Sequence, residues 1–184
     1  MKKSIGLVEL RSIAKGIEAT DEMLKAANVE IVLSTAICPG KYITIIKGEV
    51  GAVKSSIAVG KEVGDTFLLE SFIIPNVSED IFPALSGTTA IEHIASLGVV
   101  ETMSATASII AGDILVKSAN VKLIEIRLAR GLGGKGFVLI TGDVSSIKTA
   151  IKSCEEGLKE TGSIVSTVVI PSPSKELVSS IFQI

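Results

Sequence analysis

The segment Ile5-Gly6-Leu7-Val8-Glu9-Leu10 is the best guide to the fold, because a similar segment, Leu97-Gly98-Val99-Val100-Glu101-Thr102, occurs later in the chain. At the same offset, Lys25-Ala26-Ala27-Asn28-Val29 returns as Lys117-Ser118-Ala119-Asn120-Val121. Matches in one register over such a length indicate an internal duplication, and the repeated unit of about 90 residues has the size of a small domain. The sequence therefore predicts two copies of one domain, which together make up nearly the whole chain.

The two copies are expected to span residues 1–88 and 89–184, joined by the short polar segment Ser86–His93. In the first copy, strands are predicted at residues 4–10, 29–37, 41–47 and 67–74, and helices after Ser12, after Glu49 and at about 78–84. In the second copy, strands are predicted at 96–102, 121–129, 136–141 and 163–170, and helices at 104–119, 143–160 and 174–181. The order βαββαβα in each copy indicates an α+β domain of the ferredoxin-like type.

Single residues set three further expectations for the helices of the first copy. Apolar positions recur at helical spacing along the first helix, namely Ile13, Ile17, Thr20, Leu24 and Ala27. Asn28 suits the end of that helix as a C-cap residue. Gly60 and Gly64 are expected to end the second helix, because glycine weakens a helix interior.

Composition argues against several classes of function. The chain has 184 residues, of which 47% are hydrophobic and 21% charged, and its net charge is −2. Nucleic-acid binding is not expected, because the chain has no basic excess, no Trp, one Tyr and five Phe. No apolar run reaches the roughly 18 residues of a membrane span, and Glu9 and Arg11 interrupt the N-terminal run, which argues against a signal peptide. Two cysteines do not make a disulfide framework.

The repeated motifs resemble the shell domain of bacterial microcompartments. The resemblance rests on Gly6-Leu7-Val8-Glu9 and on Lys25–Val29. It also rests on a motif that occurs twice, in Lys41–Val50 and in Lys135–Val144, in which a lysine begins a strand and a glycine, an acidic residue and a valine follow the strand. It covers both copies. With Ile37-Cys38-Pro39-Gly40-Lys41 in the first pore turn, the chain is similar to the tandem-domain shell proteins of the propanediol-utilisation type.

This resemblance implies a structural protein, not an enzyme, in the shell of a microcompartment in the bacterial cytoplasm. Tandem members of the family form homotrimers that mimic a hexamer, and they pack laterally against other shell proteins. The turns of six domains meet on the central axis, where this type carries one [4Fe-4S] cluster per trimer. One cysteine per chain holds the cluster, and the matching residue is Cys38. The resemblance also implies electron transfer across the shell, with an encapsulated redox enzyme as a further partner.

The two cysteines differ in their surroundings in the sequence. Cys38 lies between two predicted strands in a turn with Pro39 and Gly40, where a thiol is either displayed or simply fills the turn. Cys154 belongs to the apolar stripe of the last long helix and is expected in the core. Iron–sulfur clusters are usually held by four thiolates, so one displayed thiol is too few. Three copies of Cys38 around a three-fold axis would supply three ligands and leave a fourth position open.

The second pore turn departs from the first. Arg130 stands where Cys38 would be, and Gly131-Leu132-Gly133-Gly134 makes the turn two residues longer. That run lacks the Gly-x-Gly-x-x-Gly and Walker patterns and joins two strands, so a flexible pore turn is expected here and a phosphate cradle is not. Arg130 is either a charged partner near an anionic cluster or only a surface residue.

Matching polar residues stand at the helix ends of both copies, namely Lys25, Asn28, Lys117 and Asn120. By themselves they are typical of solvated helix ends, where the helix dipole favours a lysine. The resemblance implies that they make contacts between adjacent tiles at the shell edge. Glu9 and Glu101 also match, for no reason visible in the sequence. His93, in the linker, lacks a partner at metal-ligand spacing.

Two other functions remain open from the sequence. The first is a shell tile whose axial opening is a plain metabolite pore, with Cys38 unligated. The second is a redox enzyme that uses the Cys38 thiol as a nucleophile. Such a nucleophile needs a base or cation beside it, and Lys41 is the one cation close in sequence.

Overall fold

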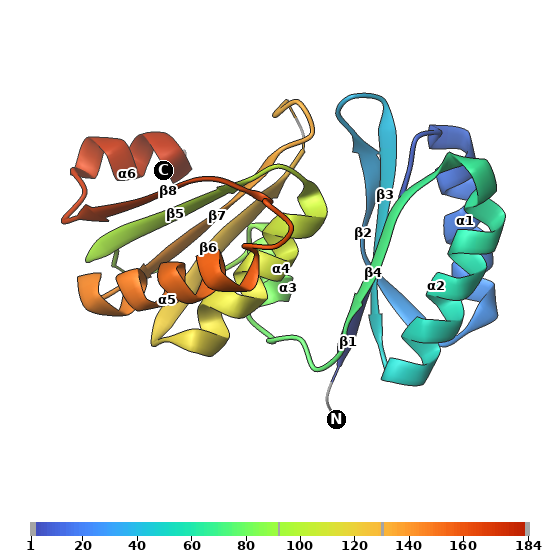
Figure 1. Ribbon diagram of the computed structural model, residues 1–184, viewed down its shortest axis with the longest axis horizontal. Coiled ribbons are helices and arrows are strands. Elements are labelled where there is room, and N and C mark those ends of the chain that lie inside the picture. The colour runs from blue at the N-terminus through green and yellow to red at the C-terminus, as the bar shows by residue number, and fades with distance from the viewer. Residues whose placement is uncertain (1–2, 92, 130, 183–184) are drawn as a thin grey trace.

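The computed structural model describes residues 3–91, 93–129 and 131–182, and it contains two α+β units (Figure 1). The elements of the first are β1 (Ser4–Leu10), α1 (Ile13–Ala26), β2 (Val29–Ile37), β3 (Lys41–Gly48), α2 (Val50–Gly64), η1 (Asp65–Phe67), β4 (Leu68–Ile74) and α3 (Ile81–Ser86). The elements of the second are β5 (Ser96–Thr102), α4 (Ala105–Ser118), β6 (Val121–Leu128), β7 (Gly136–Gly142), α5 (Val144–Gly157), β8 (Ile164–Pro171) and α6 (Lys175–Phe182).

Each unit contains one four-stranded antiparallel sheet, and the two sheets have the same topology. Sheet A has the order β2-β3-β1-β4, and sheet B has the order β6-β7-β5-β8. Even the register shifts agree, because β2 shifts between Ile31 and Leu33 and β6 shifts between Leu123 and Glu125. The predicted duplication and the predicted α+β fold are thereby confirmed. Among the described residues, no helix combines the length and the apolar character needed to cross a membrane.

Helices α1 and α2 cover one face of sheet A. Successive residues of a strand point to opposite faces, so Gly6, Val8 and Leu10 share the face that these helices cover. Val8 and Leu10 belong to a buried cluster with residues of both helices, namely Ala19, Met23, Val53 and Ile57. A Cβ atom at Gly6 would lie 2.7 Å from side-chain atoms of Val53 and Ile57, so a glycine is required where α2 approaches β1.

The other face of sheet A packs against the second unit. It carries four fully buried side chains, namely Ile5, Leu7, Ile43 and Ile45. They share one apolar cluster with Ile81 of α3 and with Ile109 and Leu115 of α4, and Figure 1 shows these two helices between the sheets. Although α3 follows β4 in the chain, it packs on β6 of the second unit. One continuous core therefore joins the two copies.

The apolar stripe predicted on the first helix forms, but most of it does not face the core of the first unit. Ile13 and Ile17 are 43% and 56% exposed, whereas the equivalent Ala105 and Ile109 of α4 are 1% and 0% exposed. Helix α1 faces its own sheet mainly with the smaller Gly16, Ala19 and Thr20 and with Met23. The predicted helical period is confirmed, but the large apolar residues of the stripe, Ile13, Ile17 and Leu24, remain exposed.

One expectation about helix ends was wrong, and another was correct only in part. Helix α1 has Ala27 as its C-cap residue, in an extended conformation, so Asn28 lies one residue beyond the cap; Ala119 and Asn120 repeat this arrangement. Helix α2 ends at Gly64, as expected, but it continues through Gly60, because Gly60 makes room for Met23, whose sulfur would lie 2.5 Å from an added Cβ atom. The cap at Ser12 is confirmed, since its hydroxyl accepts the backbone N–H of Lys15 at 3.3 Å.

We predict that Gly6→Ala lowers the free energy of unfolding by about 1–3 kcal/mol, because the added methyl group overpacks the contact between α2 and β1. The matched change Gly51→Ala lies in the same helix with open space around the new Cβ atom. It should leave stability unchanged or raise it by up to about 1 kcal/mol through helix propensity. Urea denaturation followed by circular dichroism measures both effects, and equal stability of the two variants would contradict the packing argument.

Candidate functional site at the paired strand turns

Two turns lie side by side at the same end of the molecule, one from each copy (Figure 1). The first joins β2 to β3 through residues 38–40, and Gly40 has φ 73°, as a tight turn requires. The second joins β6 to β7, and its Gly131, Gly133 and Gly134 have φ of 69°, 62° and 93°. The glycines that the sequence singled out therefore supply backbone conformations that other residues rarely adopt.

The two turns are in contact. The backbone N–H of Cys38 donates to the carbonyl oxygen of Ala129 at 3.1 Å. A Cβ atom at Gly134 would lie 3.6 Å from the Cys38 carbonyl oxygen and 3.8 Å from Cδ of Pro39. Cys38 is half-buried, and Leu132 belongs to the same second turn. Arg130 lies outside the described residues. Its two interpretations, as a charged partner near a cluster or as a surface residue, both stay open.

An ion pair beside each turn was missed by sequence reasoning. Glu9 accepts a hydrogen bond from Nζ of Lys41 at 2.7 Å, and Glu101 accepts one from Nζ of Lys135 at 3.0 Å. The two pairs differ in burial, because the Glu9 side chain is 4% exposed and that of Glu101 is 35% exposed. This pairing explains why both copies have an acid there. The repeated acid and lysine were a visible signal, but linking them required the antiparallel register of the strands.

One accessible thiol per chain is available at this site. Cys154 is fully buried on α5, as predicted, and burial raises the pKa of its thiol to about 12, with a further contribution from Glu155. His93 is exposed in the linker. In the part of the chain that the structure describes, no three His, Cys, Asp or Glu residues come together as metal ligands. A metal cluster at Cys38 therefore needs ligands from further chains.

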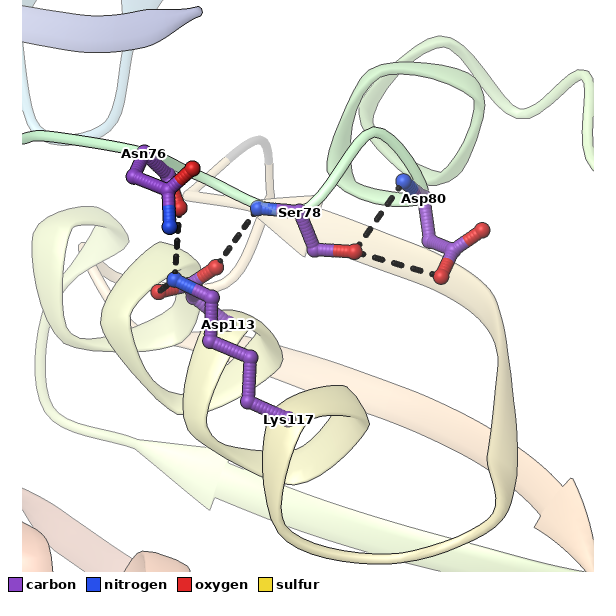
Figure 2. A network of polar contacts seen from close by, with 5 residues as sticks. All are labelled: Asn76, Ser78, Asp80, Asp113 and Lys117. Carbon is purple, nitrogen blue, oxygen red and sulfur yellow. Dashed lines mark hydrogen bonds and ion pairs between the residues drawn. The ribbon is translucent and has the colours of Figure 1, made fainter. Parts of the chain in front are cut away.

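The two lysines predicted at the shell edge occupy equivalent positions, but their side chains have different partners. Lys117 donates to Oδ2 of Asp113 at 2.6 Å and to the backbone carbonyl oxygen of Asn76 at 2.8 Å (Figure 2). Lys25 bonds only to Asp21 and Glu22 on its own helix, among the residues described, and these carboxylates raise its pKa. The two asparagines that follow these helices, Asn28 and Asn120, are exposed.

Two hollows lie on the face of sheet B that is turned away from α4 and α5. One, of about 790 Å³, is lined by Val99, Phe137 and Val168 among others, and extends to the second turn. The other, of about 950 Å³, lies between the linker and α6 and includes His93. The equivalent face of sheet A is filled, because the core between the copies covers it.

We predict that one thiol per native chain reacts with a thiol reagent and that a second reacts only in guanidinium chloride. Cys38 lies in an accessible turn, whereas burial keeps the Cys154 thiol protonated and shielded. Titration of metal-free protein with a chromogenic disulfide counts these thiols. The Cys38→Ser variant should show none in the native state, and rapid reaction of that variant would refute the assignment.

Comparison with known proteins agrees with this architecture. The profile of the BMC domain matches the chain twice, over residues 4–77 and 96–173. The bacterial microcompartment shell protein PduT of Citrobacter freundii is 41% identical over 177 residues, which cover 96% of each chain. The carboxysome shell protein CsoS1A of Hydrogenovibrio crunogenus is 35% identical over 88 residues, which are 45% of this chain and 90% of that protein.

A solved structure gives the same result in three dimensions. The crystal structure of a microcompartment protein from Desulfitobacterium hafniense has a TM-score of 0.93 and 45% sequence identity to this chain, with 97% of this chain and 99% of that one covered. The resemblance inferred from the repeated motifs is therefore confirmed. The chain belongs to the BMC domain family and carries two BMC domains in tandem.

Proposed function

We propose that this protein is a structural tile of a bacterial microcompartment shell, in which three chains close into a ring of six BMC domains. The observation that carries the proposal is the unequal burial of equivalent residues, since Ile17 is 56% exposed and Ile109 is 0% exposed. The second copy already packs on the first within the chain. The same contact, repeated between chains, would bury the first copy of one chain on the second copy of the next.

Two apolar surfaces remain for such a contact. The α1 surface consists of the exposed apolar residues of α1 and β2, namely Ile13, Ile17, Leu24 and Ile31. The sheet B surface consists of residues that line the hollow on sheet B, namely the half-buried Val99 and Phe137 and the exposed Val168, with the buried Leu139 beneath them. Their equivalents in the other copy, on α4 and on sheet A, lie in or against the core that joins the two copies. The α1 surface is therefore the natural occupant of the sheet B surface of another chain.

A contact of this kind joins two different surfaces, so it generates either a closed ring or an open filament. A ring of three chains gives every copy one neighbour on each side and leaves neither surface bare. In such a ring the two kinds of turn would alternate around the central axis, because they already lie side by side within one chain. We propose that the exposed Asn28 and Asn120 contact other shell proteins at the outer edge of the tile, together with the side-chain ammonium groups of Lys25 and Lys117.

We predict that Ile17→Glu yields a folded single chain. The side chain is already mostly exposed in one chain, but burying a carboxylate at the interface should cost about 3 kcal/mol or more. That is over a hundredfold in affinity. Light scattering measures the molar mass, and circular dichroism checks the fold. A trimer that survives this change at micromolar concentration would argue against the proposed contact.

Two controls sharpen this test. Lys152→Glu introduces the same acid on the exposed surface of α5 and should leave the trimer intact. Ile109→Glu places the same charge at the equivalent position, which is fully buried within the chain, and should prevent folding.

We further propose that the trimer holds one [4Fe-4S] cluster on its axis through three Cys38 thiolates. The residues fit this group in kind, since Cys38 is the accessible thiol and lies in the turn beside the second copy's turn. Such a cluster supplies one-electron redox chemistry, which suits electron transfer across the shell to an encapsulated redox enzyme. This chain would contribute the thiolates and a close-fitting glycine-rich turn. We propose no enzymatic role for it.

We predict that anaerobic reconstitution with iron and sulfide gives brown protein with about one cluster per three chains. Cys38→Ser should abolish the colour, the iron and the EPR signal of the reduced protein, whereas Cys154→Ala, a change in the core, should retain all three. Cys38→Ser protein that keeps its iron would refute the ligand assignment. Trimeric wild type that takes up no cluster would favour the plain pore, and thiol turnover by single chains would favour the enzyme.

A further inference from the structure

A polar contact ties the two copies together within the chain, beside their shared apolar core (Figure 2). After β4, the backbone passes along α4, where the N–H of Ser78 donates to Oδ1 of Asp113 at 2.8 Å. Lys117 bridges Oδ2 of Asp113 and the carbonyl oxygen of Asn76. The Asp113 side chain is only 10% exposed, and Asn76 has φ 55°, which turns the chain toward the helix. We call these four residues the in-chain polar contact.

The duplication provides every part of this contact a second time, but the parts lie apart. Asp21 and Lys25 of α1 are the equivalents of Asp113 and Lys117, and they form an ion pair at 2.5 Å. Both side chains are 62% exposed. The equivalents of Asn76 and Ser78 are Ser172 and Ser174, which follow β8 and are exposed. Helices α1 and α6 lie at opposite ends of the molecule, so the two halves cannot meet within one chain (Figure 1).

The backbone after β8 repeats the shape that the contact needs. Ser172 has φ 49° against 55° for Asn76, and neither residue is a glycine. Pro173 replaces Val77 between the two contact positions. That change removes one N–H, but in the first copy the Val77 N–H donates to Lys3 within its own unit and takes no part in the polar contact. The chain therefore still offers a carbonyl at residue 172 and an N–H at residue 174, the positions equivalent to those that make the contact in the first copy.

We propose that Asp21 of one chain accepts the N–H of Ser174 of the next chain, while Lys25 donates to the carbonyl oxygen of Ser172 of that chain. This inference rests on the proposed trimer and names the polar residues that close it. The occupant of the surface around Ser172 and Ser174 is thus a second copy of this chain. An ammonium group has three donors, so Lys25 keeps one for the outer edge of the tile.

The contact would give the ring its alignment. A carboxylate suits the N–H groups at the start of α6, where the helix dipole is positive, and bonds to charged groups are stronger than neutral ones. Glu22, whose equivalent in α4 is Ile114, gives Lys25 a second carboxylate before assembly. Lys25 would exchange this carboxylate for the Ser172 carbonyl, as Lys117 already bonds to the Asn76 carbonyl.

Cross-linking of paired cysteines tests the inference directly. In the Cys38→Ser background, Asp21→Cys and Ser174→Cys are combined in one chain and treated with a short bifunctional maleimide. We expect covalent dimers and trimers on denaturing gels, with no species beyond the trimer. A matched pair, Lys54→Cys with Ser174→Cys, places the thiol at another exposed position, on α2, and should give at least tenfold less product. Asp21→Cys alone and Ser174→Cys alone should give no cross-linked product.

The outcomes separate this inference from the trimer itself. Light scattering on each untreated variant shows whether a trimer is present. A trimer that gives no more product with the Asp21 pair than with the Lys54 pair would overturn the polar contact and leave the ring standing. A protein that stays a single chain at all concentrations would overturn the ring and the contact together.

A second measurement does not depend on introduced thiols. Asp21→Ala should raise the concentration at which the trimer dissociates about ten- to hundredfold, as expected for loss of hydrogen bonds to a charged group. Glu18→Ala, a neighbouring acid that pairs with Lys15 on α1, should shift it less than threefold. Equal shifts for the two variants would overturn the role of Asp21.

Discussion

One apolar contact underlies the other features of the structure. The second domain packs onto the face of sheet A that α1 and α2 do not cover. Burying Ile109 with Leu7 and Ile45 removes several large side chains from water, and each contributes about 1.5–3 kcal/mol. A duplicated chain makes such a head-to-tail contact once, between its two copies. One contact surface of the first copy and the complementary surface of the second copy are then left without a partner in the same chain. The exposed α1 surface and the partly exposed sheet B surface are therefore consequences of the fold itself.

The same packing also sets the chemistry of the paired turns. It brings the backbone of Cys38 against Ala129 and Gly134, so the thiol of the first copy meets the glycine-rich turn of the second. One chain holds one accessible thiol, too few to hold a cluster. In the proposed ring, three-fold symmetry brings three Cys38 thiols together without any further cysteine in the sequence. The proposed cluster therefore requires the proposed ring.

Equivalent residues of the two copies do different work because their neighbours differ. In the pair with Lys41 the Glu9 carboxylate is buried, whereas in the pair with Lys135 the Glu101 carboxylate is about one-third exposed. Lys117 joins two domains, whereas its counterpart Lys25 is held by its own helix in a single chain. Duplication thus provides two matching sets of groups, and only one of the two sets finds its partners within the same chain.

The duplication, the order of strands and helices, and the core position of Cys154 could all be predicted from the amino-acid sequence, because periodicity and repetition are local properties of the chain. It also singled out the two turns through their glycines. Three features depend on the three-dimensional packing and could not be predicted. Ile13 and Ile17 point away from their own sheet, Glu9 pairs with Lys41, and α3 packs on the second domain. An apolar stripe has the same period whether its partner is its own sheet or another surface, so burial is fixed by the neighbour and not by the pattern.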